Sequence, residues 1–375
     1  MAKLKLATIL GTRPEIIRLA EIIKKADQLF DHILIHTGQN YDYTLNEIFF
    51  SDLELRKPDK FLSVVGDHLG ETIGNVIARS YEILLKEMPD ALLVLGDTNS
   101  VLCTIAAKRL KIPIFHMEAG NRCFDQNVPE EINRKISDHI SDINLTYTEH
   151  SRRYLLSEGF RKDHVFVTGS PLREVLDRYH HQIEASQILS KLKLLKGQYF
   201  VISAHREENI DIEDNFIHLA ESINAVADIY RLPIIFSTHP RTEKQIRKKG
   251  ITFNPLIQLM KPFGFFDYVQ LQKNSFCVLS DSGTISEEST MLGFPAVSIR
   301  TSTERPEAID AGTIVLGGIR RDKVLNSIEL CKATFAIERN LIPWEYTVKD
   351  TSDRVVRVIQ SYTSIVNQVT WNKQF

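Results

Sequence analysis

Residues 276–288 read FCVLSDSGTISEE, a short apolar run followed by a turn of small polar residues and the start of a helical pattern. A buried strand that passes through such a turn into a helix is the building unit of α/β proteins. The free N–H groups of the helix start, together with Ser282, Gly283 and Thr284, offer hydrogen-bond donors to a diphosphate. Glu288, one turn further on, can accept hydrogen bonds from ribose hydroxyls. Residues 284–287 also fit a capping box, and the two interpretations are compatible.

A second polar cluster, His205-Arg206-Glu207-Glu208-Asn209, follows the expected strand at residues 199–203. His205 can titrate near neutral pH, and Arg206 can hold a phosphate. Both clusters lie where parallel strands end, which is where α/β proteins place their ligands. Residues 238–241 repeat the pattern more weakly, and His239 is expected only to line the same site.

Two series of apolar runs alternate with helical patterns along the chain. The first series covers residues 4–10, 32–37, 91–95, 112–116, 143–147 and 165–168, and the second covers 199–203, 234–238, 276–280, 296–299 and 313–316. Continuous apolar strands between helices indicate parallel sheets that are covered on both faces. The sequence therefore predicts an α/β protein with two doubly wound domains and a cleft between them. We place the domains at residues 1–170 and 171–351, with a last amphipathic helix over 352–375 for which Ser352 is the expected N-cap.

Composition limits the class of protein. The 375 residues are 43% hydrophobic and 25% charged, with a formal net charge of −2. This balance argues against nucleic acid as the main partner, and no run approaches the about 18 apolar residues of a transmembrane helix. The four cysteines are scattered without metal-ligand spacing, so we expect reduced thiols in a cytoplasmic protein with no metal and no membrane partner.

The first strand runs directly into Gly11-Thr12-Arg13-Pro14-Glu15. This turn is not the GxGxxG fingerprint of dinucleotide-binding proteins, and no Walker loop occurs elsewhere. Arg13 could reach a phosphate in a bidentate way, while the alternative is a capped helix start with an exposed arginine.

Three carboxylate positions follow at strand ends or helix starts of the first domain: Asp97, Glu118 and Glu130. For Asp97 the alternative is a helix N-cap, and for Glu130, next to Glu131, it is a favourable interaction with the helix dipole. Carboxylates gathered in one cleft raise the pKa of at least one of them, as abstraction of a carbon-bound proton requires.

Seven motifs in this order, GTRPE, GDTNS, HMEAG, PEEINR, HREEN, DSGTISEE and TERPEA (residues 303–308), resemble the non-hydrolysing UDP-N-acetylglucosamine 2-epimerase family over nearly the whole chain. The resemblance implies a GT-B fold, with two Rossmann-like domains and a last helix that packs back on the first of them. It also implies a UDP-sugar substrate, no cofactor and a homodimer.

In that family a base removes the proton at sugar carbon 2 while UDP leaves carbon 1, and UDP then adds back to the resulting 2-acetamidoglycal. Carried over motif by motif, Asp97, Glu118 and Glu130 are the acid/base candidates, and His205 with Arg13 stabilises the departing diphosphate. The other substrate-binding residues implied by the motifs are Arg18, Arg206, Asn209, His239, Ser282, Gly283, Thr284, Glu288 and Arg305.

Some details depart from the glucosamine enzymes. Arg18 stands where many members have lysine, and residues 121–128 (NRCFDQNV) replace an LRTGD-type loop. Together with residues 37–43 and 263–268, this loop is similar to the branch that converts UDP-2-acetamido-2,6-dideoxy-L-talose to UDP-N-acetyl-L-fucosamine for capsule and O-antigen assembly. The alternatives are the glucosamine/mannosamine enzyme, a hydrolysing epimerase, a GT-B glycosyltransferase and a non-catalytic UDP-sugar sensor.

Overall fold

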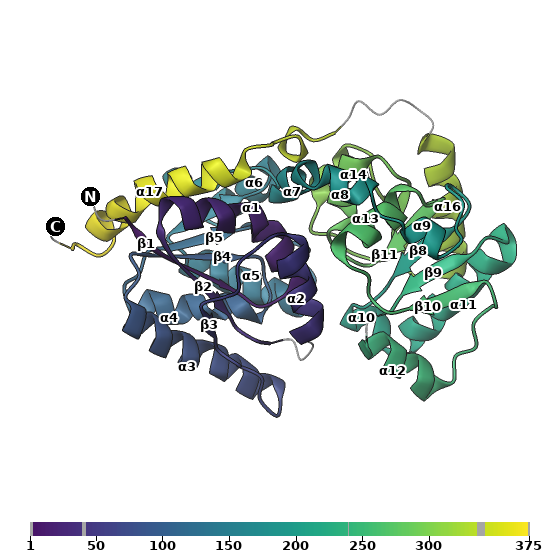
Figure 1. Cartoon of the computed structure of the whole chain (residues 1–375), viewed down its shortest axis with the longest axis horizontal. Helices are drawn as coiled ribbons and strands as arrows, with labels where there is room; N and C mark the ends of the chain where they lie inside the picture. The colour runs from purple at the N-terminus through teal and green to yellow at the C-terminus, as the bar shows by residue number, and fades with distance from the viewer. Residues whose placement is uncertain (1–2, 40–42, 239, 336–341, 374–375) are drawn as a thin grey trace. The chain divides into compact units, whose positions relative to one another are not determined.

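The computed structural model describes residues 3–39, 43–238, 240–335 and 342–373. The chain forms two compact units, one made of Met1–Arg178 with Thr347–Phe375 and the other of Tyr179–Tyr346. Both are built from a parallel sheet with helices on its two faces (Figure 1). The predicted α/β class is therefore confirmed.

The sheet of the first unit has the strand order β3-β2-β1-β4-β5-β6-β7. Its strands are β1 (Lys5–Leu10), β2 (Asp31–His36), β3 (Lys60–Phe61), β4 (Ala91–Leu95), β5 (Ile114–Met117), β6 (Ile143–Thr146) and β7 (Val165–Val167). All pair in parallel, and the residues of β1 and β4 are almost wholly buried. The apolar runs in the sequence correspond to these strands because both faces of the sheet are covered.

Helices of the first unit form two layers. α1 (Arg13–Leu29), α7 (Pro171–Arg178) and α17 (Thr351–Val369) pack together, and Figure 1 shows the yellow α17 lying along the purple α1. α3 (Leu69–Glu87), α4 (Cys103–Arg109) and α5 (Pro129–Ile140) pack with the short 3₁₀ helix η1 (Asn99–Leu102). The remaining elements are α2 (Tyr43–Asp52), α6 (Glu149–Ser157) and η2 (Lys162–His164).

The second unit repeats the plan with the strand order β10-β9-β8-β11-β12-β13. Its strands are β8 (Phe200–Ser203), β9 (Ile234–Ser237), β10 (Ile257–Met260), β11 (Cys277–Ser280), β12 (Ala296–Ser298) and β13 (Val315–Leu316). The sheet is covered by helices that include α11 (Glu213–Tyr230), α14 (Ile285–Leu292) and α16 (Arg321–Phe335). The others are α8 (His180–Glu184), α9 (Ile188–Lys191), α10 (Glu207–Ile210), α12 (Pro240–Lys249), α13 (Phe265–Lys273), α15 (Pro306–Asp310) and η3 (Trp344–Tyr346).

One cap prediction was wrong. Ser352 lies inside α17, whose N-cap is Asp350, and Ser352 does not cap the helix. Its backbone N–H and its hydroxyl instead donate to the Glu174 carboxylate on α7, at 2.8 and 2.5 Å. A neighbouring helix thus supplies the acceptor that a capping side chain would have provided.

Both sheets reverse their strand order at one point, between β1 and β4 in the first unit and between β8 and β11 in the second. Loops after the strands on each side of such a switch point diverge to opposite faces, which leaves a crevice for ligands at the carboxyl ends of the strands. The GTRPE and GDTNS turns follow the two strands at the first switch point. HREEN and DSGT follow the two strands at the second.

Candidate functional site

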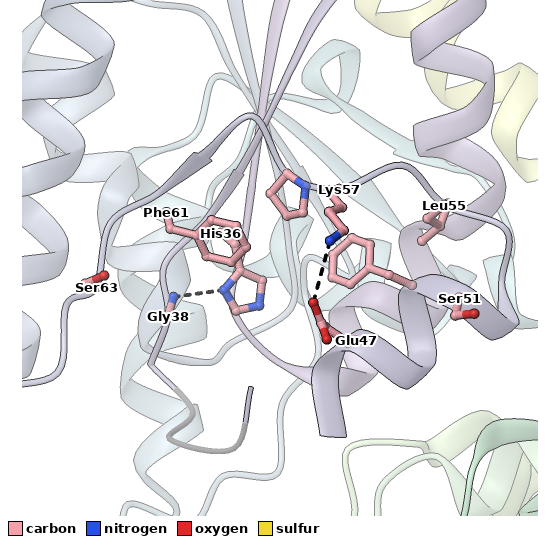
Figure 2. A pocket seen from close by; sticks show the side chains of 10 residues that line it. His36, Gly38, Glu47, Ser51, Leu55, Lys57, Phe61 and Ser63 are labelled. Atoms are coloured by element: carbon pink, nitrogen blue, oxygen red, sulfur yellow. Dashed lines mark hydrogen bonds and ion pairs between the residues drawn. The ribbon is translucent and has the colours of Figure 1, made fainter. Parts of the chain in front are cut away.

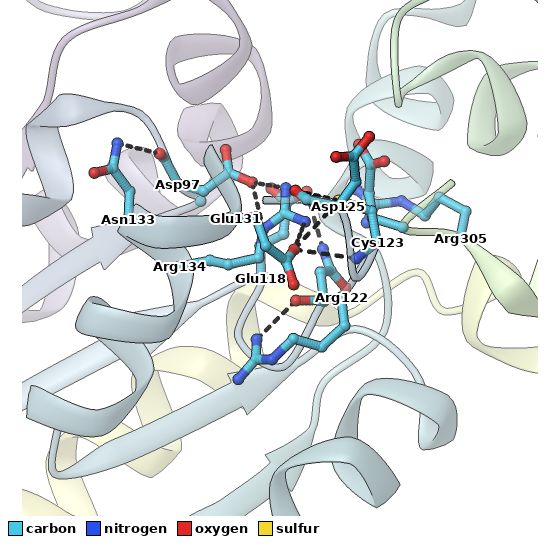
Figure 3. Close-up of polar contacts among 12 residues, drawn as sticks. Asp97, Glu118, Arg122, Cys123, Asp125, Glu131, Asn133, Arg134 and Arg305 are labelled. Carbon is cyan, nitrogen blue, oxygen red and sulfur yellow. Dashed lines mark hydrogen bonds and ion pairs between the residues drawn. The ribbon is translucent and has the colours of Figure 1, made fainter. Parts of the chain in front are cut away.

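Asp97 follows β4 and is bound by a buried arginine from α5. Arg134 donates to Asp97 Oδ2 through both Nε (3.0 Å) and Nη2 (2.5 Å), as Figure 3 shows. The alternative of a helix N-cap is excluded, because Thr98 caps η1 by accepting a hydrogen bond from the Ser100 N–H. Asp97 is therefore held by a cation and keeps its second oxygen, Oδ1, for other contacts.

Glu118 lies after β5 in a left-handed backbone conformation, with φ of +61°. Such a conformation is costly for a residue other than glycine and is found most often at functional sites. The Glu118 side chain is buried and forms an ion pair with Arg18, whose guanidinium stacks 5.5 Å from the centre of the Tyr147 ring. The second Glu118 oxygen accepts a longer hydrogen bond from Asn121 Nδ2, at 3.4 Å.

A fully buried charge network fixes the backbone on both sides of Glu118. Asp138 accepts hydrogen bonds from His116 Nδ1 (2.9 Å), from Arg122 Nη1 (2.7 Å) and from the Gly120 N–H (3.2 Å). Burial by itself raises the pKa of Asp138, but the His116 and Arg122 contacts outweigh it and lower the pKa below its ordinary value. His116 Nε2 lies 2.7 Å from the Gly96 carbonyl oxygen, so the same network ties the Asp97 turn to the Glu118 turn.

The acidic pair at the start of α5 has two different environments. Glu130 lies on the partly exposed first turn of α5, and Glu131 is completely buried. Glu131 accepts the N–H groups of Cys123 and Phe124 and forms an ion pair with Arg134 at 2.9 Å. Burial raises the pKa of Glu131, but the Cys123 N–H and Arg134 lower it more. Glu131 therefore serves as the anchor of the 121–128 loop, a role that sequence reasoning missed.

The GTRPE turn is organised by its glutamate. Glu15 Oε2 accepts from the N–H groups of Gly11 (3.0 Å) and Thr12 (2.6 Å) and from the Thr12 hydroxyl (2.7 Å), which completes a capping box. Burial raises the pKa of Glu15 to about 7. Arg13, the next residue, is exposed and lies 5.6 Å from the centre of the Phe49 ring.

In the second unit, the carboxylate of Asp281 joins the HREEN and DSGTISEE motifs. Asp281 accepts the N–H groups of His205 (2.9 Å) and Arg206 (3.0 Å) and the side-chain amide of Asn209 (3.1 Å). Burial raises the pKa of Asp281, but the positive charge and hydrogen bonds of His205 and Arg206 bring it down to about 2. His205 Nδ1 lies 3.2 Å from Asp281, on a side chain that is 41% exposed. The HREEN turn is therefore held against the DSGT turn by hydrogen bonds to the buried Asp281 carboxylate.

The Ser282–Thr284 turn is not the capping box that residues 284–287 suggested. Thr284 is already helical and makes no side-chain cap, while its hydroxyl lies 2.9 Å from the Ser282 hydroxyl. A Cβ on Gly283 would come within 2.4 Å of Glu304 Oε1. A side chain at position 283 would therefore require the Glu304 carboxylate to move. Glu288 accepts a hydrogen bond from Gln272 Nε2 at 2.6 Å.

Three arginines close to this motif are paired with carboxylates, and two of them, Arg300 and Arg305, are buried. Glu304 binds Arg206 (3.2 Å) and Arg300 (2.6 Å), and Arg305 binds the buried Glu287 at 3.2 Å. Arginines held in this way by carboxylates present their remaining N–H groups in a fixed direction, as recognition of a phosphate requires. His239, the last of the predicted binding residues, lies outside the described residues.

The contacts described above gather some of the predicted residues into one cluster in each unit, and they do not include Arg13, Glu130 or Glu288. Asp97, Glu118 and Arg18 belong to one hydrogen-bonded neighbourhood in the first unit, while His205, Arg206, Asn209, Ser282 and Gly283 belong to another in the second. Sequence reasoning missed the buried residues that hold them: Glu15, Arg134, Asp138 and Asp281. Glu15 in GTRPE, Arg134 in PEEINR and Asp281 in DSGTISEE stand inside quoted motifs, which was the available signal, whereas Asp138 stands in none of them.

The described residues lack a metal-binding cluster and a membrane-spanning helix. They contain no group of three or more His, Cys, Asp or Glu side chains arranged to hold a metal ion. Within the same residues, no helix is long and apolar enough to cross a membrane.

Comparison with known proteins identifies close similarities. A family model described as UDP-N-acetylglucosamine 2-epimerase matches residues 23–360. The structure of UDP-N-acetylglucosamine 2-epimerase from Rickettsia bellii is 47% identical, with 99% of this chain and 100% of that chain covered and a TM-score of 0.90. The enzyme of Methanocaldococcus jannaschii, solved in complex with UDP-GlcNAc and UDP, is 34% identical over 95% of this chain and 99% of that chain, with a TM-score of 0.89.

A further curated relative has a different substrate in its name. The UDP-2,3-diacetamido-2,3-dideoxy-D-glucuronate 2-epimerase of Pseudomonas aeruginosa is 34% identical over 330 residues, which are 86% of this chain and 91% of that protein. The similarities to the solved epimerases, with two parallel sheets of the doubly wound type, confirm the predicted GT-B fold.

Proposed function

The chain belongs to the UDP-N-acetylglucosamine 2-epimerase family and is a UDP-sugar 2-epimerase, an isomerase; we propose that it interconverts UDP-2-acetamido-2,6-dideoxy-L-talose and UDP-N-acetyl-L-fucosamine. The observation that carries the chemical part of this proposal is the pair of carboxylates that follow the neighbouring strands β4 and β5. Asp97 is bound by Arg134 on one oxygen only, and Glu118 is bound by Arg18. Two carboxyl groups held by separate arginines are suited to the two proton transfers, in which one removes a proton as the carboxylate and the other returns a proton from its protonated form.

The reaction begins with proton removal from sugar carbon 2. A carboxylate takes the proton, the electron pair forms the carbon 1–carbon 2 double bond, and the carbon 1–oxygen bond breaks to release UDP. UDP then adds back to carbon 1, and carbon 2 receives a proton on the opposite face. Asp97, Glu118 and Glu130 are the proposed acid/base groups. No oxidant or reductant is consumed, and the proposal includes no cofactor.

Retention of UDP is assigned to the second unit. The departing diphosphate gains negative charge, which His205, Arg206 and Arg13 are proposed to stabilise. Ser282, Gly283 and Thr284 offer hydroxyl and N–H donors, and Glu288 is the proposed partner of the ribose. Arg18, Asn209, His239 and Arg305 complete the proposed substrate-binding set. Because Asp281 fixes the His205–Asn209 turn, these donors require little reorganisation when charge develops.

The proposed choice of sugar rests on the loop at residues 121–128. Asn121, its first residue, donates to Glu118 and accepts from the Ser151 hydroxyl at 2.9 Å. Glu131 accepts two N–H groups of the same loop. The segment that departs from the glucosamine enzymes therefore contacts Glu118, one of the proposed acid/base groups, which supports a different sugar at the reacting carbon.

The proposal is tested by offering UDP-2-acetamido-2,6-dideoxy-L-talose and UDP-N-acetylglucosamine to the protein separately in deuterated water. Proton NMR should show interconversion of the 6-deoxy-L-talose and L-fucosamine compounds, with deuterium incorporated at carbon 2. Turnover of UDP-N-acetylglucosamine alone would overturn the choice of sugar and favour production of UDP-N-acetylmannosamine, in agreement with the names of several relatives.

Other outcomes of the same experiment identify the remaining classes. Stoichiometric release of UDP with free sugar would indicate a hydrolysing epimerase, and transfer to an added acceptor would indicate a glycosyltransferase. Binding of both compounds with no deuterium at carbon 2 would indicate a sensor. A cytoplasmic homodimer acting in capsule or O-antigen assembly completes the proposal, and sedimentation velocity measures its mass.

A further inference from the structure

The carboxylate of Glu131 is the centre of a junction on the buried face of α5. It accepts the N–H groups of Cys123 (3.1 Å) and Phe124 (3.3 Å), and the Cys123 thiol lies 3.3 Å from its Oε2. The same oxygen accepts from Arg134 Nη1 at 2.9 Å. Glu131 is completely buried, and the partly exposed Lys135 is a second cation 3.4 Å from its Oε1. The carboxylate thus joins the 121–128 loop to an arginine that binds a proposed acid/base group.

Arg134 is shared by two carboxylates. Its Nε and Nη2 donate to Asp97 Oδ2, and its Nη1 donates to Glu131 (Figure 3). Glu131 and Arg134 are three residues apart on α5, so they lie on the same side of the helix. A guanidinium held on one edge can still turn about its flexible side chain, whereas one held on two edges has a fixed plane. Glu131 therefore fixes the direction from which Arg134 holds Asp97.

The main chain at Asp97 is held separately. Asn133 Nδ2 donates to the Asp97 carbonyl oxygen at 3.0 Å and to Asn99 Oδ1 at 3.1 Å. This anchor does not involve Glu131. Loss of the Glu131 carboxylate should therefore act on the side chain of Asp97, by way of Arg134, and leave the turn itself in place.

We propose that Glu131 is a positioning residue for the proton transfers: it orients Arg134, and Arg134 orients the Asp97 carboxylate toward carbon 2 of the sugar. This role rests on the proposed function, because it requires Asp97 to take part in the reaction, but it does not depend on which sugar is converted. An anchor for the 121–128 loop would need only an acceptor for the two N–H groups. The two roles predict different results when Arg134 is replaced.

Glu131→Gln, Arg134→Gln and the double variant test this role with UDP-2-acetamido-2,6-dideoxy-L-talose or UDP-N-acetylglucosamine, whichever the wild type converts. In Glu131→Gln, kcat for deuterium incorporation at carbon 2 should fall by at least about 10-fold, because a misplaced carboxylate reacts more slowly. KM and the affinity for UDP, measured by calorimetry, should stay within about threefold because the proposed diphosphate donors are other residues. Arg134→Gln should lose at least as much kcat.

The double variant distinguishes positioning from loop anchoring. If Glu131 acts through Arg134, adding Glu131→Gln to Arg134→Gln should lower kcat by less than about threefold. A residue that only anchors the loop would cause the same loss in both backgrounds, so a larger further loss would overturn the proposal. The comparison holds even if Glu131→Gln alone fails to fold, because the double variant leaves no buried arginine beside a neutral partner.

Two control variants complete the experiment. Lys135→Gln removes the partly exposed cation at Glu131 and should leave kcat within about twofold. Phe61 lines a cavity of about 440 Å³ on the edge strand β3, which two strands separate from β4 (Figure 2). Phe61→Ala should lower the unfolding temperature and leave kcat within about twofold. An equal loss of kcat in Phe61→Ala and Glu131→Gln would indicate general destabilisation and overturn the proposal.

The wild type and Asp97→Asn separate failure of this role from failure of the proposed function. A wild type that incorporates deuterium into neither sugar nucleotide would overturn the proposed function and the role of Glu131 with it. Exchange that Asp97→Asn removes and Glu131→Gln leaves unchanged would overturn the role of Glu131 alone.

Discussion

Arg134 binds Asp97 through a single carboxylate oxygen, with Nε and Nη2 both directed at Oδ2 at 3.0 and 2.5 Å. No donor contacts the other oxygen, Oδ1, within the residues that the structure describes. The arginine thus orients the carboxylate, while Oδ1 is left for contact with a substrate. Arg134 in turn is held by Glu131 at 2.9 Å.

The first prediction concerns Asp97→Asn. The amide keeps an oxygen for Arg134 but cannot take a proton, so kcat and deuterium incorporation at carbon 2 should fall by about 10²- to 10⁴-fold. UDP affinity, measured by calorimetry, should change by less than about threefold because the proposed diphosphate donors are other residues. Asp163→Asn, on an exposed side chain of the same unit, is the control. Deuterium exchange at the wild-type rate in Asp97→Asn would remove Asp97 from the reaction.

A second prediction concerns Asp281, whose pKa is lowered to about 2 from an ordinary value of 3.8. A carboxylate with a lowered folded-state pKa stabilises the fold above its ordinary pKa, and this contribution is lost as the pH falls toward 2. The shift corresponds to about 2 to 3 kcal/mol at pH 7. Asp281→Asn should lose this amount in urea unfolding and bind UDP at least 10-fold more weakly.

The matched control for Asp281 is Asp322→Asn, on an exposed position of α16. It should leave both the free energy of unfolding and UDP affinity unchanged. If Asp281→Asn unfolds with wild-type stability at pH 7, the ionised carboxylate does not support the HREEN turn.

Apolar periodicity was sufficient to predict most of the fold. β1 and β4 are continuous buried runs, which parallel sheets require, and the sequence shows them plainly. β3 was missed because it is a two-residue edge strand, Lys60–Phe61, with one half-buried and one exposed residue. β10 has a single buried residue, Ile257, and lies at the other sheet's edge.

The supporting side chains could not be predicted in the same way. The buried face of α5 contains Glu131, Asn133, Arg134, Ser137 and Asp138, which hydropathy alone assigns to solvent. The three charged residues of this face, Glu131, Arg134 and Asp138, are buried because they pair with groups distant in sequence, such as Asp97, Arg122 and the Cys123 N–H. Pairing of this kind depends on the packed structure and leaves no periodic signal.

A third prediction compares the two acidic partners of Arg122. Asp138 is fully buried, whereas Glu158 is 28% exposed on its side chain. Asp138→Asn leaves Arg122 buried beside a neutral group and loosens the Gly120 N–H contact, which should cost about 3 to 5 kcal/mol of stability. Glu158→Gln should cost at most about 1 kcal/mol, because water can replace the lost acceptor.

Thermal unfolding measures both variants, and the epimerase rate gives a second readout. Asp138→Asn should also reduce kcat, since Asp138 fixes the backbone on both sides of Glu118 through His116 and Gly120. Equal losses of stability in the two variants would contradict the role assigned to the buried network.

The fourth prediction uses the raised pKa of Glu15, about 7 compared with an ordinary 4.5. Between these pH values the unfolded chain loses a proton that the folded chain keeps, so stability falls as the pH rises through this window. The contribution is about 2 to 3 kcal/mol between pH 5 and pH 8. In the Glu15→Gln variant this side chain cannot titrate. The loss of unfolding free energy between pH 5 and pH 8, measured by urea unfolding, should therefore be smaller than in the wild type by this amount. Glu71→Gln, on the exposed first turn of α3, should show the same change in unfolding free energy as the wild type. If Glu15→Gln also shows the wild-type change, Glu15 is ionised in the folded chain from pH 5 to pH 8, and the prediction is wrong.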